Sequence, residues 1–99
     1  MNWQVYLIRC SDNSLYTGIT TDIERRFRQH GAGSGARYFR GRKPVEVVYL
    51  ENGHTRGSAA KREAAIKALS RAEKVLLTES DRNPSLRRGD TTGKREQNE

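Results

Sequence analysis

Residues 5–30 read VYLIRCSDNSLYTGITTDIERRFRQH, and this stretch decides the fold. Residues 3–9 and 15–20 are rich in β-branched and aromatic side chains, and the turn-forming tetrapeptide at residues 11–14 separates them. Such a pattern predicts a β-hairpin.

The register of this hairpin follows from side-chain parity, because residues paired across two strands point to the same face. Pairing Cys10 with Ser14 leaves a three-residue loop whose last residue, Asn13, tolerates the left-handed conformation that such a loop often requires. One face then carries Tyr6, Ile8, Tyr16 and Gly18, and the other carries Trp3, Val5, Leu7, Leu15, Thr17 and Ile19. Because Gly18 has no side chain, we expect a shallow hollow beside Tyr6.

A helix is expected directly after the hairpin, over residues 23–30. Thr21 and Glu24 have the spacing of a capping box, and Asp22 adds a negative charge to the first turn.

On this helix, a rotation of about 100° per residue places Ile23 and Phe27 on the stripe that packs against the sheet. Arg26 and His30 border the stripe and are four residues apart, so they stack one turn above the other. Two polar side chains therefore lie where a surface helix normally places apolar ones.

The 99 residues, of which 33% are hydrophobic, suffice for one small domain, which we place at residues 1–81. Residues 82–99 are polar and charged, which predicts a flexible, disordered basic tail. The single cysteine, Cys10, argues against a disulfide framework and fits a reducing cytoplasm. With neither a basic leader nor a long apolar run at the N-terminus, no signal peptide or membrane span is expected.

Positive charge is concentrated in the middle of the chain. There are 19 lysines and arginines against 12 acidic residues, a net charge of +7 that favours a polyanionic partner. Residues 25–43 hold no acidic residue and seven basic ones: Arg25, Arg26, Arg28, Arg37, Arg40, Arg42 and Lys43. This concentration predicts a nucleic-acid-binding surface, with an ordinary solvated face as the alternative.

Residues 31–43 form a glycine-rich loop that is long for a connection inside a small domain, which is a sign of function. Its basic side chains can neutralise phosphates, while Tyr38 or Phe39 can stack on an exposed base. The alternative is that at least one of these two rings fills a gap in the core.

The third strand begins at Pro44 and runs through residues 45–50, either as the central strand or as one covered on both faces. Residues 51–57 predict a turn-rich linker in which His54 is solvated. Ser58 is expected to cap the second helix.

A third helix is predicted over residues 71–78, because Ser70 and Glu73 repeat the capping-box spacing. On it, Val75 and Leu76 are expected to face inward.

Glu63 falls on the apolar stripe of the second helix, between Ala60 and Ile66 in projection. A buried carboxylate without a partner is costly. An ion pair with Arg26 or another arginine would compensate it, and so would a coordinated divalent metal ion.

The order of V-Y-L, Y-T-G and D-I-E-R-R-F-R-Q-H along the chain resembles the GIY-YIG nuclease superfamily. The segments L-Y-T-G-I-T-T-D-I-E-R-R, G-A-R-Y and P-V-E-V-V-Y resemble its small, stand-alone bacterial branch of the YhbQ type, over roughly residues 3–69. This resemblance implies an α/β (α+β) fold, with a three-stranded antiparallel sheet and the chain order β-β-α-β-α-α.

The resemblance also implies a metal-dependent endonuclease that hydrolyses phosphodiester bonds in DNA and acts in repair or recombination. Tyr6 or Tyr16 would orient or deprotonate the attacking water, Arg26 would grip the phosphate, and His30 would relay a proton or orient the phosphate. Glu63 matches the family's glutamate that holds the catalytic metal ion, here Mg²⁺ or Mn²⁺. Ordinary core packing is the alternative role for each tyrosine.

The sequence departs from the family pattern at three places. Gln4-Val5-Tyr6 lacks the initial glycine, and Thr17 replaces the usual isoleucine or valine. Many nucleases of the family also have an asparagine late in the domain. The only candidate here is Asn83, and we do not assign that role to it. The separate DNA-binding domains of larger relatives are also missing. Two alternatives therefore stand: a catalytically weak module that binds DNA or RNA through residues 25–43, and a subunit that depends on a protein partner for specificity.

Overall fold

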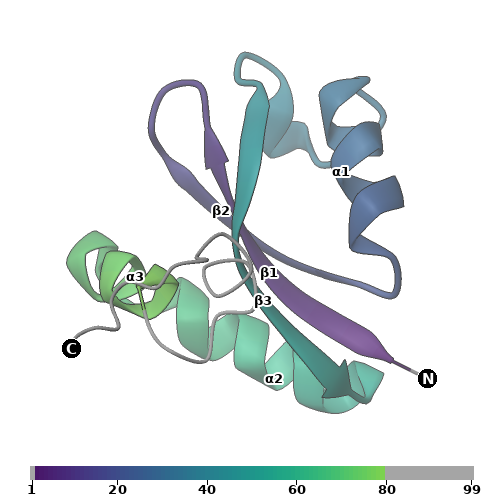
Figure 1. The fold of residues 1–99 in the computed structure, drawn as a ribbon, viewed down its shortest axis with the longest axis vertical. Helices are drawn as coiled ribbons and strands as arrows, with labels where there is room; N and C mark the ends of the chain where they lie inside the picture. Colours follow the sequence, from purple (N-terminus) through teal and green to yellow (C-terminus); the bar gives the residue numbers. More distant parts are fainter. Residues whose placement is uncertain (1, 80–99) are drawn as a thin grey trace, which may run out of the picture.

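Residues 2–79, the part of the chain that the computed structural model describes, fold into an antiparallel sheet flanked by helices (Figure 1). The strands are β1 (Trp3–Cys10), β2 (Leu15–Thr20) and β3 (Pro44–His54). The helices are α1 (Ile23–Gly31), α2 (Arg56–Lys67) and α3 (Arg71–Thr78), and a 3-10 helix spans Arg37–Phe39. The predicted fold class and element order are confirmed. The tail predicted at residues 82–99 lies outside the described residues.

The β1–β2 hairpin has the predicted register. Tyr6 pairs with Gly18, and the amide of Cys10 donates to the carbonyl oxygen of Ser14 at 2.9 Å. Asn13 adopts a left-handed conformation with φ of 67°. The three-residue loop therefore fixes which side chains of each strand face α1.

The sheet separates two apolar clusters. One, on the side of α2 and α3, is built from Val5, Leu7, Tyr49, Ala59 and Ile66. The other, on the side of α1, is built from Tyr6, Ile8, Cys10 and Phe39. As predicted, Ile23 and Phe27 of α1 pack against the second cluster. Figure 1 shows α1 and α2 on opposite sides of the sheet.

Helix α1 begins one residue later than a Thr21 cap requires. The N-cap is Asp22, whose Oδ1 accepts a hydrogen bond from the backbone N–H of Arg25 at 3.1 Å. The backbone N–H of Asp22 in turn donates to Oγ1 of Thr20. The predicted capping box of Thr21 and Glu24 is therefore wrong, because the neighbouring carboxylate takes the capping position.

Strand β3 is an edge strand, because the sheet order is β2-β1-β3 and β1 lies in the centre. A central position for β3 is therefore wrong. The alternative, cover on both faces, is confirmed: Val47 and Leu50 pack against the cluster beneath α1, and Val48 against the cluster beneath α2.

The linker predicted at residues 51–57 is also wrong, because β3 continues through His54, which pairs with Trp3, and α2 begins at Arg56. His54 is only partly exposed, and its ring nitrogens bond Oε1 of Glu51 and Oγ of Ser58, both at 2.8 Å. The side chain therefore ties the end of β3 to the first turn of α2.

Helix α2 is capped by Thr55 and not by Ser58. Oγ1 of Thr55 accepts from the backbone N–H of Ser58, and Oγ of Ser58 accepts from the backbone N–H of Thr55. Ser58 thus fills the reciprocal position of the capping box. The capping box of Ser70 and Glu73 at α3 is confirmed.

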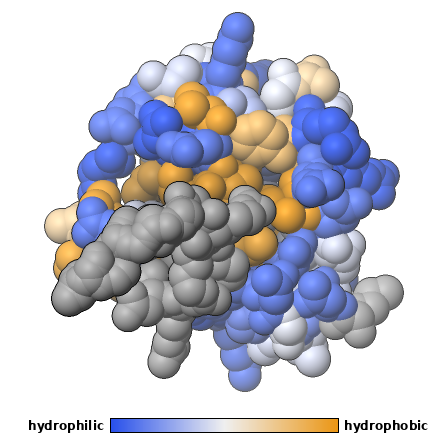
Figure 2. Space-filling view, in the orientation of Figure 1, coloured by the Kyte–Doolittle hydropathy of each residue, from blue (hydrophilic) through white to orange (hydrophobic). Residues whose placement is uncertain are grey.

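The surface carries few large apolar side chains. On α3, Leu77 packs against the core while Leu76 is 66% exposed, so the inward position predicted for Leu76 is wrong; successive helical residues point about 100° apart. On the face drawn in Figure 2, hydrophobic residues gather near the middle and hydrophilic ones surround them. No helix within residues 2–79 is long and apolar enough to cross a membrane.

Candidate active site

Two tyrosine rings lie side by side on the face of the hairpin that α1 covers. Tyr6 comes from the central strand and Tyr16 from the edge strand β2, and their ring centroids are 6.1 Å apart. Tyr6 is 1% exposed, whereas Tyr16 is half-buried. Both tyrosines point to the same face, as the hairpin register predicts, and Tyr16 is the more accessible of the two.

Gly18 lies directly beneath the ring of Tyr6. A β-carbon at Gly18 would come 2.4 Å from Oη of Tyr6 and 2.9 Å from Cε2 of Tyr16. The hollow predicted beside Tyr6 does not exist, because the tyrosine's own ring fills it. A glycine is required here by the close approach of the side chain.

His30 holds Tyr6 in place. Its Nε2 lies 2.9 Å from Oη of Tyr6, and its Nδ1 accepts a hydrogen bond from the backbone N–H of Ala36 at 3.2 Å. Because Nδ1 is an acceptor, the neutral ring carries its proton on Nε2 and donates it to the tyrosine. Burial, with a smaller effect from Arg26, lowers the pKa of His30 to about 4, so the ring is neutral near pH 7.

The glycine-rich loop packs onto the same histidine. A β-carbon at Gly35 would come 2.1 Å from Nδ1 of His30, and the ring centroid of Phe39 lies 4.2 Å from that of His30. Phe39 is buried and is therefore the ring that fills the core, as one alternative predicts. Tyr38 stays partly exposed, with the guanidinium carbon of Arg42 4.1 Å from its ring centroid.

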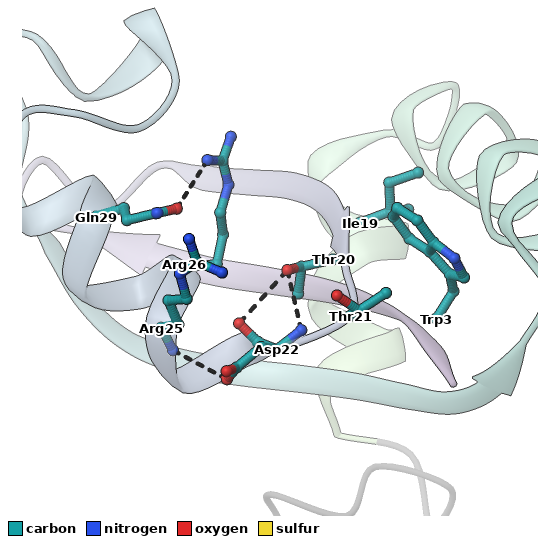
Figure 3. Close-up of a pocket in the computed structure, with 8 residues that line it drawn as sticks. All are labelled: Trp3, Ile19, Thr20, Thr21, Asp22, Arg25, Arg26 and Gln29. Atoms are coloured by element: carbon teal, nitrogen blue, oxygen red, sulfur yellow. Dashed lines mark hydrogen bonds between the residues drawn. The ribbon is translucent and has the colours of Figure 1, made fainter. Parts of the chain in front are cut away.

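Arg26 reaches this cluster from α1. Its Nη1 donates to Oε1 of Gln29 at 3.0 Å, as Figure 3 shows. Among the described residues, Arg26 forms no ion pair with a carboxylate. The guanidinium is thus held in position by a neutral side chain and keeps its positive charge uncompensated.

Glu63 lies on α2, which packs on the opposite face of the sheet from α1. Its side chain is 23% exposed, and its Oε2 lies 3.3 Å from Nζ of Lys67. The partner is therefore a lysine one turn along the same helix, and the ion pair predicted with Arg26 or another arginine is wrong.

The charges of both helices act on both phenols. Burial is the largest effect and raises the pKa of Tyr6 and of Tyr16 above the usual value for tyrosine. Glu63 raises both pKa values further, and Arg26 partly opposes the rise. Tyr6, Tyr16 and His30 are thus in contact with one another, and the charges of Arg26 and Glu63 lie close enough to change the pKa of both phenols.

The other predicted nucleic-acid-binding residues differ in whether their side chains are bound to another group or exposed. Arg42 is tied down by an ion pair with Asp12, at 2.7 Å, and by a hydrogen bond to the carbonyl oxygen of Tyr38. The remaining side chains are exposed: Arg25, Arg28, Arg37, Arg40 and Lys43.

Sequence reasoning missed the residues that support the site. Gln29 and Lys67 follow Arg26 and Glu63 by three and four positions, a helical spacing that could have revealed them. Ala36 contributes a backbone group, which has no signal in the sequence. Within residues 2–79, no three His, Cys, Asp or Glu side chains lie together as a ready-made metal site.

The sequence matches a known protein family over the residues that form this cluster. The GIY-YIG catalytic domain matches residues 2–75, which include both tyrosines and Glu63. The chain belongs to the GIY-YIG family. This match supports the relation predicted from the spacing of V-Y-L and Y-T-G.

Within the GIY-YIG family, the chain is similar to small proteins named UPF0213. A UPF0213 protein of Haloquadratum walsbyi is 55% identical over 75 residues, which cover 76% of this chain and 84% of the relative. One of Staphylococcus haemolyticus is 47% identical, covering 76% of this chain and 92% of the relative. The predicted small, stand-alone branch is confirmed by these lengths and identities.

Two solution structures share the fold of this chain. The UPF0213 protein BH0048 from Bacillus halodurans has a TM-score of 0.56 at 36% identity, and the alignment covers 95% of this chain and all of that one. The protein EF2693 from E. faecalis has the same TM-score at 31% identity and covers 95% of both chains.

Proposed function

We propose that this protein is a metal-dependent endonuclease that hydrolyses phosphodiester bonds in DNA. The observation that carries the proposal is that Tyr6, Tyr16 and His30 contact one another on the face that α1 covers, with the opposite charges of Arg26 and Glu63 close enough to act on both phenols. Arg26 from α1 and Glu63 from α2 both influence Tyr6 and Tyr16, although these helices pack on opposite faces of the sheet. A tyrosine cluster that only filled the core would need neither charge.

Tyr16 is better suited than Tyr6 to orient the attacking water. It is half-buried, whereas Tyr6 is buried and already accepts a hydrogen bond from His30. Because burial raises the pKa of Tyr16, its phenol is neutral near pH 7 and acts first as a hydrogen-bonding group. Lys67 and Arg26 oppose the rise in the pKa of Tyr16, whereas Glu63 adds to it.

Arg26 serves as the phosphate ligand. A guanidinium donates two parallel hydrogen bonds to a phosphate, and no carboxylate among the described residues competes for it. Donors aimed at oxygens that gain charge in the transition state lower the barrier for phosphodiester cleavage. His30 is a positioning residue in this scheme, because both of its ring nitrogens are occupied by Tyr6 and Ala36.

Glu63 fits the binding of Mg²⁺ or Mn²⁺. Mg²⁺ is commonly held by one or two carboxylates together with waters and substrate phosphate oxygens, so a single partly exposed carboxylate suffices. The ammonium of Lys67, 3.3 Å from Oε2 of Glu63, would have to turn away for the ion to bind there. When bound, the ion would neutralise charge on the phosphate and the leaving oxygen.

DNA would bind along the exposed basic side chains of residues 25–43. Arg25, Arg40 and Lys43 are exposed and have no carboxylate partner in the described part of the chain. With a net charge of +7, binding would depend strongly on salt. DNA repair or recombination is the type of process that such an activity would serve.

A nicking assay on supercoiled plasmid tests the proposal. We expect cleavage with Mg²⁺ and none with EDTA, and a loss of rate of about a hundredfold or more for Arg26→Gln and Glu63→Gln, since such losses follow removal of one charge-stabilising group. Tyr16→Phe should lower the cleavage rate more than Tyr6→Phe. Tyr16 is the more accessible of the two, whereas the hydroxyl of Tyr6 is buried and bonded to His30.

Arg71→Gln and Glu46→Gln are the matched controls, because each changes the same charge at an exposed position on α3 or β3. Both should cleave within about threefold of the parent protein. Equal rates for Arg26→Gln and the parent, or cleavage that survives EDTA, would mean that a contaminant cuts the plasmid. Salt-dependent DNA binding without any turnover would favour a binding module instead.

A further inference from the structure

A pocket with a volume of about 230 Å³ opens beside Arg26, where the end of β2 turns into α1. Figure 3 shows Trp3 and Ile19 on one side of it, Arg25, Arg26 and Gln29 on the other, and residues 20–22 between them. The pocket therefore joins an aromatic wall from β1 to a cationic wall from α1.

The cationic wall is not neutralised. Arg25 is exposed, and only its backbone N–H bonds the carboxylate of Asp22, while Arg26 bonds the neutral Gln29. Neither guanidinium has an ion-pair partner among residues 2–79. This wall suits an anion that a guanidinium can grip through two hydrogen bonds, such as a phosphate.

The aromatic wall is anchored but accessible. Trp3 is partly buried, packs against the core beneath α2, and keeps part of its surface at the pocket. The guanidinium carbon of Arg56 lies 5.7 Å from its ring centroid, which adds a third positive charge nearby. A fixed indole beside arginines is the arrangement on which unpaired bases stack.

We propose that this pocket binds one unpaired nucleotide of a DNA strand at the phosphate that is cut. Its phosphate lies on Arg25 and Arg26, and its base stacks on Trp3. The carboxylate of Asp22 also lines the pocket and repels the phosphate from the middle, which leaves the two walls as the places for phosphate and base. This inference rests on the proposed nuclease function for the role of Arg26.

The consequence is a preference for DNA with a single-stranded segment. A base inside a duplex is stacked and paired, so it reaches the indole only after its neighbours have been disrupted, whereas the base of a flap, gap or splayed end is free. The pocket thereby assigns a substrate class to a protein whose basic loop by itself binds any DNA.

Fluorescence gives a direct test, because Trp3 is the single tryptophan of the chain. In EDTA, where no cleavage occurs, a single-stranded oligonucleotide or a splayed duplex should quench the emission of Trp3 at saturation and protect it from acrylamide. A blunt duplex of the same sequence should bind with little change in emission.

Variants locate the effect. Trp3→Leu should weaken binding of single-stranded DNA about tenfold and leave blunt-duplex binding within about twofold, as expected for the loss of one stacked base. Arg25→Gln should weaken single-strand binding and reduce the quenching, whereas Arg71→Gln, which removes the same charge from α3, should weaken binding only slightly. Because Trp3 packs against the core, thermal unfolding must show that Trp3→Leu is folded, and Arg25→Gln tests the pocket if it is not.

Unchanged Trp3 emission at saturating single-stranded DNA would overturn the inference, and so would equal losses for Arg25→Gln and Arg71→Gln. The readout is binding, so it separates this inference from the nuclease proposal. Quenching without any nicking would support nucleotide binding in the pocket and contradict the nuclease proposal. Nicking with unchanged Trp3 emission would support the nuclease proposal and contradict binding in the pocket.

Discussion

Nε2 of His30 lies 2.9 Å from the hydroxyl oxygen of Tyr6, and both side chains are almost completely buried. The other ring nitrogen accepts the backbone N–H of Ala36. One imidazole therefore connects the conformation of the glycine-rich loop to the phenol of the central strand. It can do so only while it is neutral, because a protonated Nδ1 has no lone pair for Ala36.

This relationship predicts how stability depends on pH. The pKa of His30 is about 4 in the folded protein and near 6.5 in an unfolded chain, so the unfolded state binds more protons between these values. The unfolding free energy should therefore fall as the pH falls, by about 2 kcal/mol between pH 7 and pH 5. Urea unfolding across this range measures it.

His30→Gln should lose this part of the pH dependence, while His54→Gln, the same substitution at the other histidine of the chain, should keep it. If the His30→Gln variant showed the same slope as the parent protein, the neutral, buried imidazole would be the wrong description.

Gly18→Ala should displace the ring of Tyr6 and destabilise the protein. The new β-carbon would come 2.4 Å from Oη and 2.6 Å from Cζ of Tyr6, so the ring must move away from His30. Overpacking of this kind costs about 1–3 kcal/mol, which thermal or urea unfolding detects. Gly41→Ala is the control, because no atom of residues 2–79 lies within 4 Å of its added β-carbon. Equal stability of the two variants would contradict the close contact.

Thr17→Val should make the protein more stable. Oγ1 of Thr17 is buried and has no hydrogen-bond partner among residues 2–79. Removing an unsatisfied buried hydroxyl at constant shape should raise the unfolding free energy by about 1 kcal/mol.

Thr55→Val should instead lower the unfolding free energy by about 1 kcal/mol, because Oγ1 of Thr55 caps α2. Two destabilised variants would show that the hydroxyl of Thr17 has a partner after all.

Arg40→Gln should weaken DNA binding without changing stability. Arg40 is exposed, and its backbone bonds Arg37 while no ion pair holds its side chain in the described part of the chain. If it neutralises one phosphate, the slope of log affinity against log salt should become smaller by about 0.9. Fluorescence anisotropy at several salt concentrations measures the slope. An unchanged slope would exclude Arg40 from the interface.

Much of the fold could be predicted because its signals are local. Two cross-strand partners, Cys10 and Ser14, with Asn13 between them, set the hairpin register, and side-chain parity then placed both tyrosines on one face. The caps were predicted less well, since Asp22 and Thr55 each lie near a second residue that is equally able to cap.

The strand order and the site's supports could not be predicted in the same way. Hydrophobic pattern shows that β3 is covered on both faces, but not whether β1 or β3 is central, because that depends on pairing between distant segments. The bond from Ala36 to His30 depends on the path of a loop that has no periodicity. Glu63 is partly buried, as its place on the apolar stripe predicts, but its partner is Lys67 and not an arginine.

The central position of β1 has a consequence for how the protein is made. A ribosome releases this first strand early, yet its second neighbour, β3, follows more than thirty residues later, and α2 later still. Pairing across such a distance is slow compared with closing the hairpin. A nascent or truncated chain that ends before α2 therefore carries the phenols and the guanidinium without the carboxylate.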